Sequence, residues 1–271
     1  MSVRPAAALS TPSILVYAQR ERARAMARTL FPRRRHRVIL TRTASAFEQA
    51  FHDGLVDAAI VDVGSGPGGE ESWRAARLAS EFPSVAFFGF ISLRASDVAA
   101  LTQCVACDFS DTLVEGVDDA VAREIVNREA FSARFARALH EPPEVLALSS
   151  PLQKETWRWV VSSAGRGVRT DSLAKLLRVT REHLSRTFAA DGGPNLKRVI
   201  DLVRLLAAAE LAKNPGYDVR DVAKVLGFAS PSHLSTTSQR IVGTKSASLS
   251  RLRTVDLIER FARGHGRSRR Q

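Results

Sequence analysis

Long apolar runs and cysteine are scarce in this chain of 271 residues, and its N-terminal half has no lysine. No stretch of eighteen consecutive apolar residues occurs, so the sequence predicts no membrane-spanning helix. Residues 1–12 lack the apolar core of a secretion signal, and a cytoplasmic protein is therefore expected. The two cysteines, Cys104 and Cys107, have no second pair and no nearby histidine, which favours buried thiols over a redox pair or half a metal site.

Basic charge is distributed unequally along the chain. Residues 1–144 contain 17 Arg, no Lys and 18 acidic residues, whereas the rest contains 23 Lys plus Arg and 10 acidic residues. The formal net charge of +12 therefore arises entirely in the second half. A polyanion is the partner expected for that half, and a solvated basic surface without a partner is the alternative.

Two helix–turn–helix patterns follow one another between residues 169 and 252. In the first, Leu173 and Leu177 recur at helical spacing, and Thr180 can cap a second helix by accepting a backbone N–H bond. Within that second helix Leu184 and Phe188 lie four residues apart and are expected to face inward. The side chains expected on its exposed face are those of Arg181, Glu182, Ser185 and Arg186.

The second pattern, at residues 218–238, repeats this arrangement. Val222 belongs to its apolar stripe, Gly227 permits the bend after its first helix, and Ser230 is expected to cap the next helix. Pro231 then stands in the first turn, where a missing N–H costs nothing. The exposed side chains of this helix are expected to be small and uncharged, namely Ser232, Ser235, Thr236 and Gln239.

Two such units in series resemble the DNA-binding domain of the AraC/XylS transcription regulators. The matching positions are Leu173, Ala174, His183, Leu184, Ser185, Arg186, Phe188 and Gly193 in the first unit, Arg204 and Ala208 between the units, and Val222, Ala223, Gly227, Phe228, Ser232, Leu234 and Gly243 in the second. The departures are Ser238 in place of a buried Phe, Ser246 in place of a frequent Pro, and Thr236 where the family often has Arg. These departures predict weaker packing and weaker base discrimination in the second unit.

The resemblance implies that each reading helix enters a major groove and that the two grooves are adjacent on one duplex. Arg186 is the strongest candidate for a bidentate contact to guanine, worth roughly 1–3 kcal/mol of discrimination. The second unit is expected to position the protein through phosphates, helped by Arg220, Arg240 and Lys245. The full set of candidate DNA-contacting residues is Thr180, Arg181, Glu182, Ser185, Arg186, Ser230, Ser232, Ser235, Thr236, Gln239 and Arg240, and a solvated helix face is the alternative for each.

Strand and helix patterns alternate in the N-terminal half. Strands are expected at residues 14–17, 38–40, 57–63, 85–91 and 107–109, and helices at 20–31, 45–51, 69–81, 96–103 and 118–139, the helix at 45–51 being capped by Ser45. This alternation predicts an α/β flavodoxin-like sandwich, a parallel sheet covered on both faces. The Gly-rich turn at 64–69 lacks the Lys-Ser/Thr of a phosphate-binding loop, so a plain strand-to-helix turn is expected there.

This half resembles the receiver domains of response regulators, of the CheY type. Asp62 falls where that family has its phosphate-accepting aspartate, but Ala18 and Gln19 stand in place of the acidic pair that holds Mg²⁺. Ser92 is a loose substitute for the hydroxyl after the fourth strand, and no lysine precedes Lys154. Phosphoryl transfer to Asp62 would then have little to stabilise its charge. The domain is expected to be a pseudo-receiver, which contacts other molecules without being phosphorylated. Phosphorylation of Asp62 would contradict this expectation.

The predicted organisation is a flexible start at 1–12, a receiver-like domain at 13–140, a linker at 141–150, an AraC-type DNA-binding domain at 151–253, and a short helix with a basic tail at 254–271. The expected function is a sequence-specific transcription regulator of the bacterial nucleoid. It is not expected to be an enzyme or to use a metal or other cofactor. Double-stranded DNA is its expected partner, and its receiver-like domain is expected to form a homodimer or to receive a protein or ligand signal. The alternatives are a protein-interaction adaptor or architectural DNA binder, and a phosphorylation-dependent response regulator using Asp62.

Overall fold

The computed structural model describes residues 11–64, 69–92, 94, 97–190 and 193–267. These residues divide into two compact units. The sheet unit consists of Thr11–Arg134 together with Asn214–Val225, and the helical unit consists of the described parts of Phe135–Lys213 and Leu226–Gln271. Most of the Gly-rich turn at 64–69, the first ten residues, positions 95–96 at the expected start of the fourth helix, and residues 268–271 of the basic tail lie outside the described residues.

The sheet unit contains five parallel strands in the order β2-β1-β3-β4-β5. The strands are β1 (Ser13–Tyr17), β2 (Arg37–Thr41), β3 (Ala58–Asp62), β4 (Ala86–Ile91) and β5 (Asp111–Val114). The helices are α1 (Glu21–Leu30), α2 (Ala44–Asp53), α3 (Gly69–Glu81), α4 (Val98–Ala106) and α5 (Ala122–Glu129). This strand order is that of a flavodoxin-like sheet, so the predicted fold class is confirmed.

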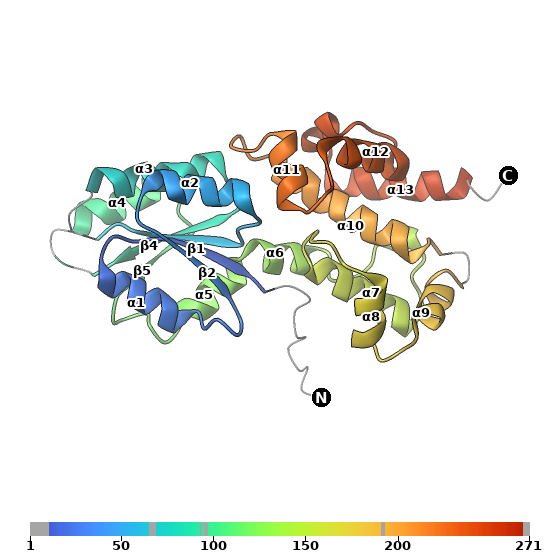
Figure 1. Cartoon of the computed structure of the whole chain (residues 1–271), viewed down its shortest axis with the longest axis horizontal. Helices are drawn as coiled ribbons and strands as arrows, with labels where there is room; N and C mark the ends of the chain where they lie inside the picture. Colours follow the sequence, from blue (N-terminus) through green and yellow to red (C-terminus); the bar gives the residue numbers. More distant parts are fainter. Residues whose placement is uncertain (1–10, 65–68, 93, 95–96, 191–192, 268–271) are drawn as a thin grey trace. The chain divides into compact units, whose positions relative to one another are not determined.

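Both faces of the sheet are covered by helices. Figure 1 shows α1 and α5 on one face and α2, α3 and α4 on the other. Every residue of β1, β3 and β4 is buried, as expected for strands enclosed on both sides. On the first face Ala23, Ala27 and Leu30 of α1 pack against the sheet, and on the second Phe47 and Phe51 of α2 pack against Phe87.

Two predicted elements differ from the observed ones around the fifth strand. The strand expected at 107–109 is wrong, because Cys107 caps α4 and Asp108 adopts a left-handed backbone with φ of 55°. The chain turns there and joins the sheet only at β5, where Asp111 lies opposite Phe88. The α4 helix accordingly extends to Ala106, beyond the expected end at 103.

The long helix expected at 118–139 is two helices, α5 and α6 (Phe131–Ala138). Ala130 between them is extended, with φ of −54° and ψ of 140°. The break is held by Asp57, whose carbonyl accepts a 2.7 Å bond from the Phe131 amide and whose carboxylate accepts one from the Ser132 amide. A third correction concerns α2, which is capped by the Thr43 hydroxyl and not by Ser45.

The helical unit is built around α10 (Leu196–Leu211). Its other helices are α7 (Pro151–Ser162), α8 (Thr170–Leu176), α9 (Arg181–Phe188), α12 (Pro231–Val242) and α13 (Thr254–Arg267), with two 3₁₀ turns at Glu144–Leu146 and Ser246–Arg251. Most side chains of α10 are buried, including Leu202, Leu205 and Leu206, which are fully inaccessible. A helix that is apolar on nearly all sides must lie in the interior of its unit.

The first and last helices of this unit have well-defined ends. The α7 helix begins at Pro151, and Ser150 and Gln153 form a capping box around its first turn. The last helix, α13, continues through Arg267, so the helix expected to be short takes in most of the segment 254–271. None of the helices among the described residues combines the length and apolarity needed to cross a bilayer.

Candidate nucleic-acid interface and the Asp62 site

The first helix–turn–helix consists of α8 and α9. Leu173 and Ala174 of α8 and Leu184 and Phe188 of α9 are buried together in its interior. The Thr180 hydroxyl accepts a 3.1 Å bond from the His183 amide and so caps α9, as predicted. The apolar spacing and the cap together fix which side of α9 faces solvent.

The outward side of α9 carries the four polar residues expected there. Arg181, Glu182, Ser185 and Arg186 are all exposed. Arg181 is loosely paired with Asp171 of α8, with 3.5 Å between Nη1 and Oδ1, and keeps 62% of its side chain exposed. The surface thus offers two guanidiniums, one carboxylate and one hydroxyl along one helix face, a set able to contact base edges and phosphates.

The α12 helix is the reading helix of the second unit. The Ser230 hydroxyl accepts a 3.0 Å bond from the His233 amide, Pro231 occupies the first turn, and Gly243 ends the helix with φ of 67°. Ser232, Thr236 and Gln239 are exposed, while Ser235 is half-buried. The cap and turn residues therefore act as predicted, and three of the four candidate readers are accessible.

Two polar residues of α12 are engaged within the helical unit. The Thr236 hydroxyl bonds to the backbone carbonyls of Ser232 and His233, at 3.0 and 3.1 Å. Arg240 forms an ion pair with Asp201 of α10, with 2.7 Å between Nη2 and Oδ2. Arg240 is thus paired with α10, although 55% of its side chain remains exposed.

Ser238 stands where the resembled family has a buried Phe, and the sequence therefore predicts weaker packing at this position. Its side chain is fully buried, and its hydroxyl donates a 2.7 Å bond to the Thr244 carbonyl. The neighbouring apolar side chains Leu234, Ile241 and Val242 are also buried. The substitution therefore exchanges apolar area for a buried hydrogen bond that holds the turn after α12.

Arg204 has a role that sequence reasoning missed. The sequence places Arg204 between the two units without a partner, and Glu210 on the same helix pairs with Lys213 and Thr254. Arg204 instead donates to the carbonyls of Leu226 and Gly227 and stacks on the Phe228 ring at 3.9 Å. Burial lowers the pKa of its guanidinium. The Gly-Phe pair is the only sequence signal that could have indicated this contact.

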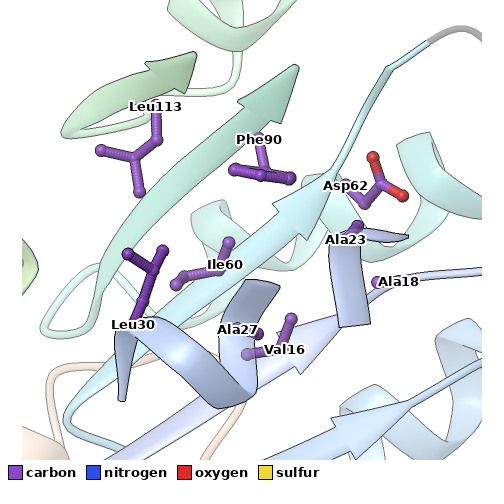
Figure 2. Close-up of a pocket in the computed structure, with 9 residues that line it drawn as sticks. All are labelled: Val16, Ala18, Ala23, Ala27, Leu30, Ile60, Asp62, Phe90 and Leu113. Carbon is purple, nitrogen blue, oxygen red and sulfur yellow. The ribbon is translucent and has the colours of Figure 1, made fainter. Parts of the chain in front are cut away.

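Asp62 lies at the carboxyl end of β3, at one end of a small apolar cavity (Figure 2). The Arg20 guanidinium lies on its carboxylate, with Nε 3.0 Å from both oxygens and Nη2 2.5 Å from Oδ1. Arg20 Nη1 also pairs with Glu115 at 3.2 Å, and Arg22 pairs with the same carboxylate. Burial raises the pKa of the Asp62 carboxyl, and the Arg20 guanidinium acts in the opposite direction.

These residues do not fit a magnesium site. Hard carboxylate oxygens would have to flank Asp62, but Ala18 and Gln19 occupy the end of β1 and the cation beside Asp62 is Arg20 itself. The described residues contain no group of three His, Cys, Asp or Glu side chains placed to hold a metal ion. The cavity beneath Asp62 has a volume of about 10 Å³, room for one water molecule.

The two cysteines differ in environment. Cys104 is buried, and burial raises the pKa of its thiol to about 11. Cys107 is only partly buried, and burial raises its pKa as well. Both groups are therefore thiols and not thiolates near neutral pH, although the expectation that both are buried holds for Cys104 alone.

Comparison with known proteins agrees with the helical geometry. A protein-family model described as a helix-turn-helix domain matches residues 173–251, which include both helix–turn–helix units. A crystal structure of full-length FixJ from B. japonicum is similar over 70% of this chain and 95% of that chain, with 15% sequence identity and a TM-score of 0.37. No curated protein sequence matches the chain.

The chain therefore carries an AraC-type helix–turn–helix region at residues 173–251 and a receiver-like, five-stranded parallel α/β sheet. The resemblance predicted from the sequence is confirmed for both halves. A helix–turn–helix DNA-binding domain combined with a receiver-like domain is the composition of a transcription regulator.

Proposed function

We propose that this protein is a sequence-specific DNA-binding transcription regulator whose two reading helices, α9 and α12, enter adjacent major grooves. The observation that carries the proposal is the outward face of α9. Its four polar residues share one exposed surface on a helix that is capped by Thr180 and fixed by Leu184 and Phe188. A net excess of basic charge in the same half of the chain supports a polyanionic partner.

Specificity is assigned mainly to α9. Arg186 there is exposed and can present a planar pair of donors to guanine. The readers on α12 are small and uncharged, and the Thr236 hydroxyl is engaged with its own helix. The second unit then contributes affinity through phosphates and little base discrimination.

Footprinting of the full chain on genomic DNA at two salt concentrations tests this proposal. A discrete protected sequence of two parts, about one helical turn apart, is expected and should persist at the higher salt. Arg181→Gln/Arg186→Gln should abolish it, while Arg77→Gln/Arg123→Gln removes the same charge from exposed positions of the sheet unit and should leave it intact. Salt-sensitive bulk binding without any discrete site would overturn sequence specificity and favour an architectural DNA binder or an adaptor.

We also propose that the receiver-like domain works without phosphorylation. The support is Arg20, which already neutralises the Asp62 carboxylate where a receiver would bring Mg²⁺ and a phosphoryl group. Incubation with acetyl phosphate and Mg²⁺ should leave the intact mass unchanged. A mass increase of one phosphoryl group that is lost in Asp62→Asn would contradict the proposal and identify a phosphorylation-dependent regulator.

Homodimerisation through the receiver-like domain is the third part of the proposal. Its support is an apolar surface around α4 and β5 where Val98, Val105 and Val117 keep 63%, 77% and 70% of their area exposed. Sedimentation of the full chain is expected to show a dimer that Val105→Asp converts to a monomer. A wild-type monomer at all concentrations would exclude this interface.

A further inference from the structure

The segment Asn214–Val225, called here the anchor segment, contains α11 (Val219–Val225), the first helix of the second helix–turn–helix. It belongs by its contacts to the sheet unit, although its sequence lies inside the helix-turn-helix region at 173–251. Its partners are the carboxyl ends of α2 and α3 and the turn after α3. The sequence predicts no such contact, and the side chains and backbone groups that form it are described below.

An aromatic cluster holds the middle of the anchor segment. The Tyr217 ring is buried and meets Phe82 edge-on, with 4.9 Å between ring centroids, and its other neighbour is His52 at 6.1 Å. The Tyr217 hydroxyl donates a 3.2 Å bond to the Phe51 carbonyl. Burial raises the pKa of this phenol, so it stays a donor at physiological pH. Burial of an aromatic ring with a satisfied hydroxyl is a strong and specific contact.

Backbone contacts fix the residues before Tyr217. The Gly216 amide donates to the Glu81 carbonyl at 2.9 Å, and Asn214 exchanges two bonds with Ser84, at 2.8 and 2.7 Å. A Cβ at Gly216 would lie 2.5 Å from Phe82, so the close approach requires glycine. These three hydrogen bonds and the close approach at Gly216 hold the segment against the turn after α3.

One ion pair and one histidine–carboxylate contact extend the interaction along α11. Lys224 Nζ lies 3.0 Å from Asp53, and His52 Nδ1 lies 3.0 Å from Asp221. The first pair is well exposed and contributes little free energy, but it fixes the direction of the helix. A helix of only seven residues is marginal by itself, so α11 depends on such external contacts.

We infer that the carboxyl ends of α2 and α3 form a docking surface for this chain's own anchor segment, and that the sheet unit thereby supports DNA binding by the second helix–turn–helix and not by the first. The inference rests on the proposed DNA-binding function. The docking surface lies at the opposite edge of the sheet from Asp62, because helices run antiparallel to the strands that precede them. A signal received by the sheet unit reaches the second reading unit through this surface.

Tyr217→Ala in the full chain tests the inference with two measurements. Hydrogen exchange at residues 219–225 is expected to accelerate at least about tenfold while exchange in α9 and α10 is unchanged. Footprinting on the two-part DNA site is expected to show about tenfold weaker protection of the half-site contacted by α12. Protection of the half-site contacted by α9 should change less than about twofold. Tyr217→Phe, which keeps the ring and removes one hydrogen bond, should give a smaller change in the same direction.

A charge reversal supplies the control against general unfolding. Asp53→Lys and Lys224→Asp should each weaken protection of the α12 part by a small factor, about twofold to fivefold, and the double reversal should restore it. Unchanged exchange at 219–225 in Tyr217→Ala, or equal weakening of both parts of the footprint, would overturn the inference. Absence of any footprint from the wild-type chain would instead overturn the proposed function, and the exchange measurement would still decide whether the docking surface holds α11.

Discussion

The two helix–turn–helix units of this chain have the same order of elements and the same spacing from the cap onward, but they differ in backbone and surface. At the bend of the first unit Arg178 adopts φ of 56°, whereas the same position of the second unit is Gly227 with φ of 66°. Their second helices also differ, since α9 has 8 residues and a charged exposed face while α12 has 12 residues and an exposed face whose candidate readers are uncharged apart from Arg240. The first unit therefore offers more charged side chains for contacts to bases, and the second has a glycine at its left-handed bend and a longer second helix.

The units differ as well in what anchors them. The inner positions of α9 are filled by Leu184 and Phe188, while α12 has Leu234 and a hydrogen-bonded Ser238 at the corresponding places. Both second helices have polar contacts, but of different origin. In the second unit Arg204 donates to the carbonyls of the turn and Arg240 pairs with Asp201. On α9 the Gln153 amide of α7 donates to the carbonyls of Thr187 and Phe188, and Arg181 pairs with Asp171. The comparison teaches that the two units hold their second helices by different contacts, one around a buried aromatic ring and the other around a buried hydrogen bond.

The largest effect is expected from removing the inner aromatic residue of the first unit. Phe188→Ala should lower the free energy of unfolding by about 3–5 kcal/mol, because a fully buried ring leaves a cavity. Ser238→Ala, its counterpart, should cost only about 1–2 kcal/mol, the loss of one buried hydrogen bond. Denaturant unfolding of both variants measures the difference, and equal losses would mean that the two reading helices are anchored alike.

The next effect concerns recognition. Arg186→Ala should reduce affinity for the DNA sequence found by footprinting by roughly 1–3 kcal/mol, about fivefold to 150-fold, and relax preference at one base pair. Thr236→Ala, at the corresponding position of α12, should change affinity less than about threefold because its hydroxyl is already bonded to the helix. Binding titrations on the natural and single-base-changed site measure both. A larger loss from Thr236→Ala would reverse the assignment of specificity.

A smaller effect of opposite sign is expected from Asp201→Asn. The substitution releases Arg240 from its ion pair, so the guanidinium becomes available to phosphate. Affinity for DNA should rise a few-fold, and its dependence on salt should steepen by up to about one counterion. Asp171→Asn, which releases Arg181 on the first unit, is the matched variant. No change in the salt dependence would show that Arg240 does not reach the backbone of the duplex.

The smallest expected effect is at the bend. Arg178→Gly should raise the free energy of unfolding by about 0.5–1 kcal/mol, because a left-handed backbone disfavours a side chain with Cβ and glycine offsets part of that gain through its unfolded-state entropy. Gly227→Arg should destabilise the second unit by a similar amount. Thermal unfolding of both variants provides the measurement, and a destabilised Arg178→Gly would mean that the Arg178 side chain has a stabilising contact.

Local signals made much of this structure predictable. Alternating strand and helix patterns gave the parallel sheet, and the hydroxyls of Thr180 and Ser230 marked the starts of both reading helices. Local signals failed where a distant residue decides the backbone. The helix expected at 118–139 is broken by Asp57, which lies more than seventy positions earlier and bonds to Ser132. The fifth strand was misplaced because its sequence is short and only half-buried.

The polar partners at the candidate sites were the least predictable part. Arg20 and Asp62 are separated by 42 positions, and Arg204 reaches carbonyls 22 and 23 positions away. Neither pair leaves a periodic pattern in the sequence, since an arginine side chain can reach in many directions. The contacts of the anchor segment could not be predicted for the same reason. Gly216 and Tyr217 have the local sequence of an ordinary turn after a helix, and only the structure shows that they contact Phe82.

The pairing of Arg20 with Asp62 has a consequence for how this protein senses its surroundings. A conventional receiver draws its counter-charge from dissolved metal and from a phosphoryl donor, so its state follows their concentrations. Here the counter-charge is covalently part of the chain and is present in every copy. The proposed function without phosphorylation follows from this difference: the energetic state of the cell would have no direct path to that carboxylate, and a signal would reach the domain as a molecule that contacts its surface.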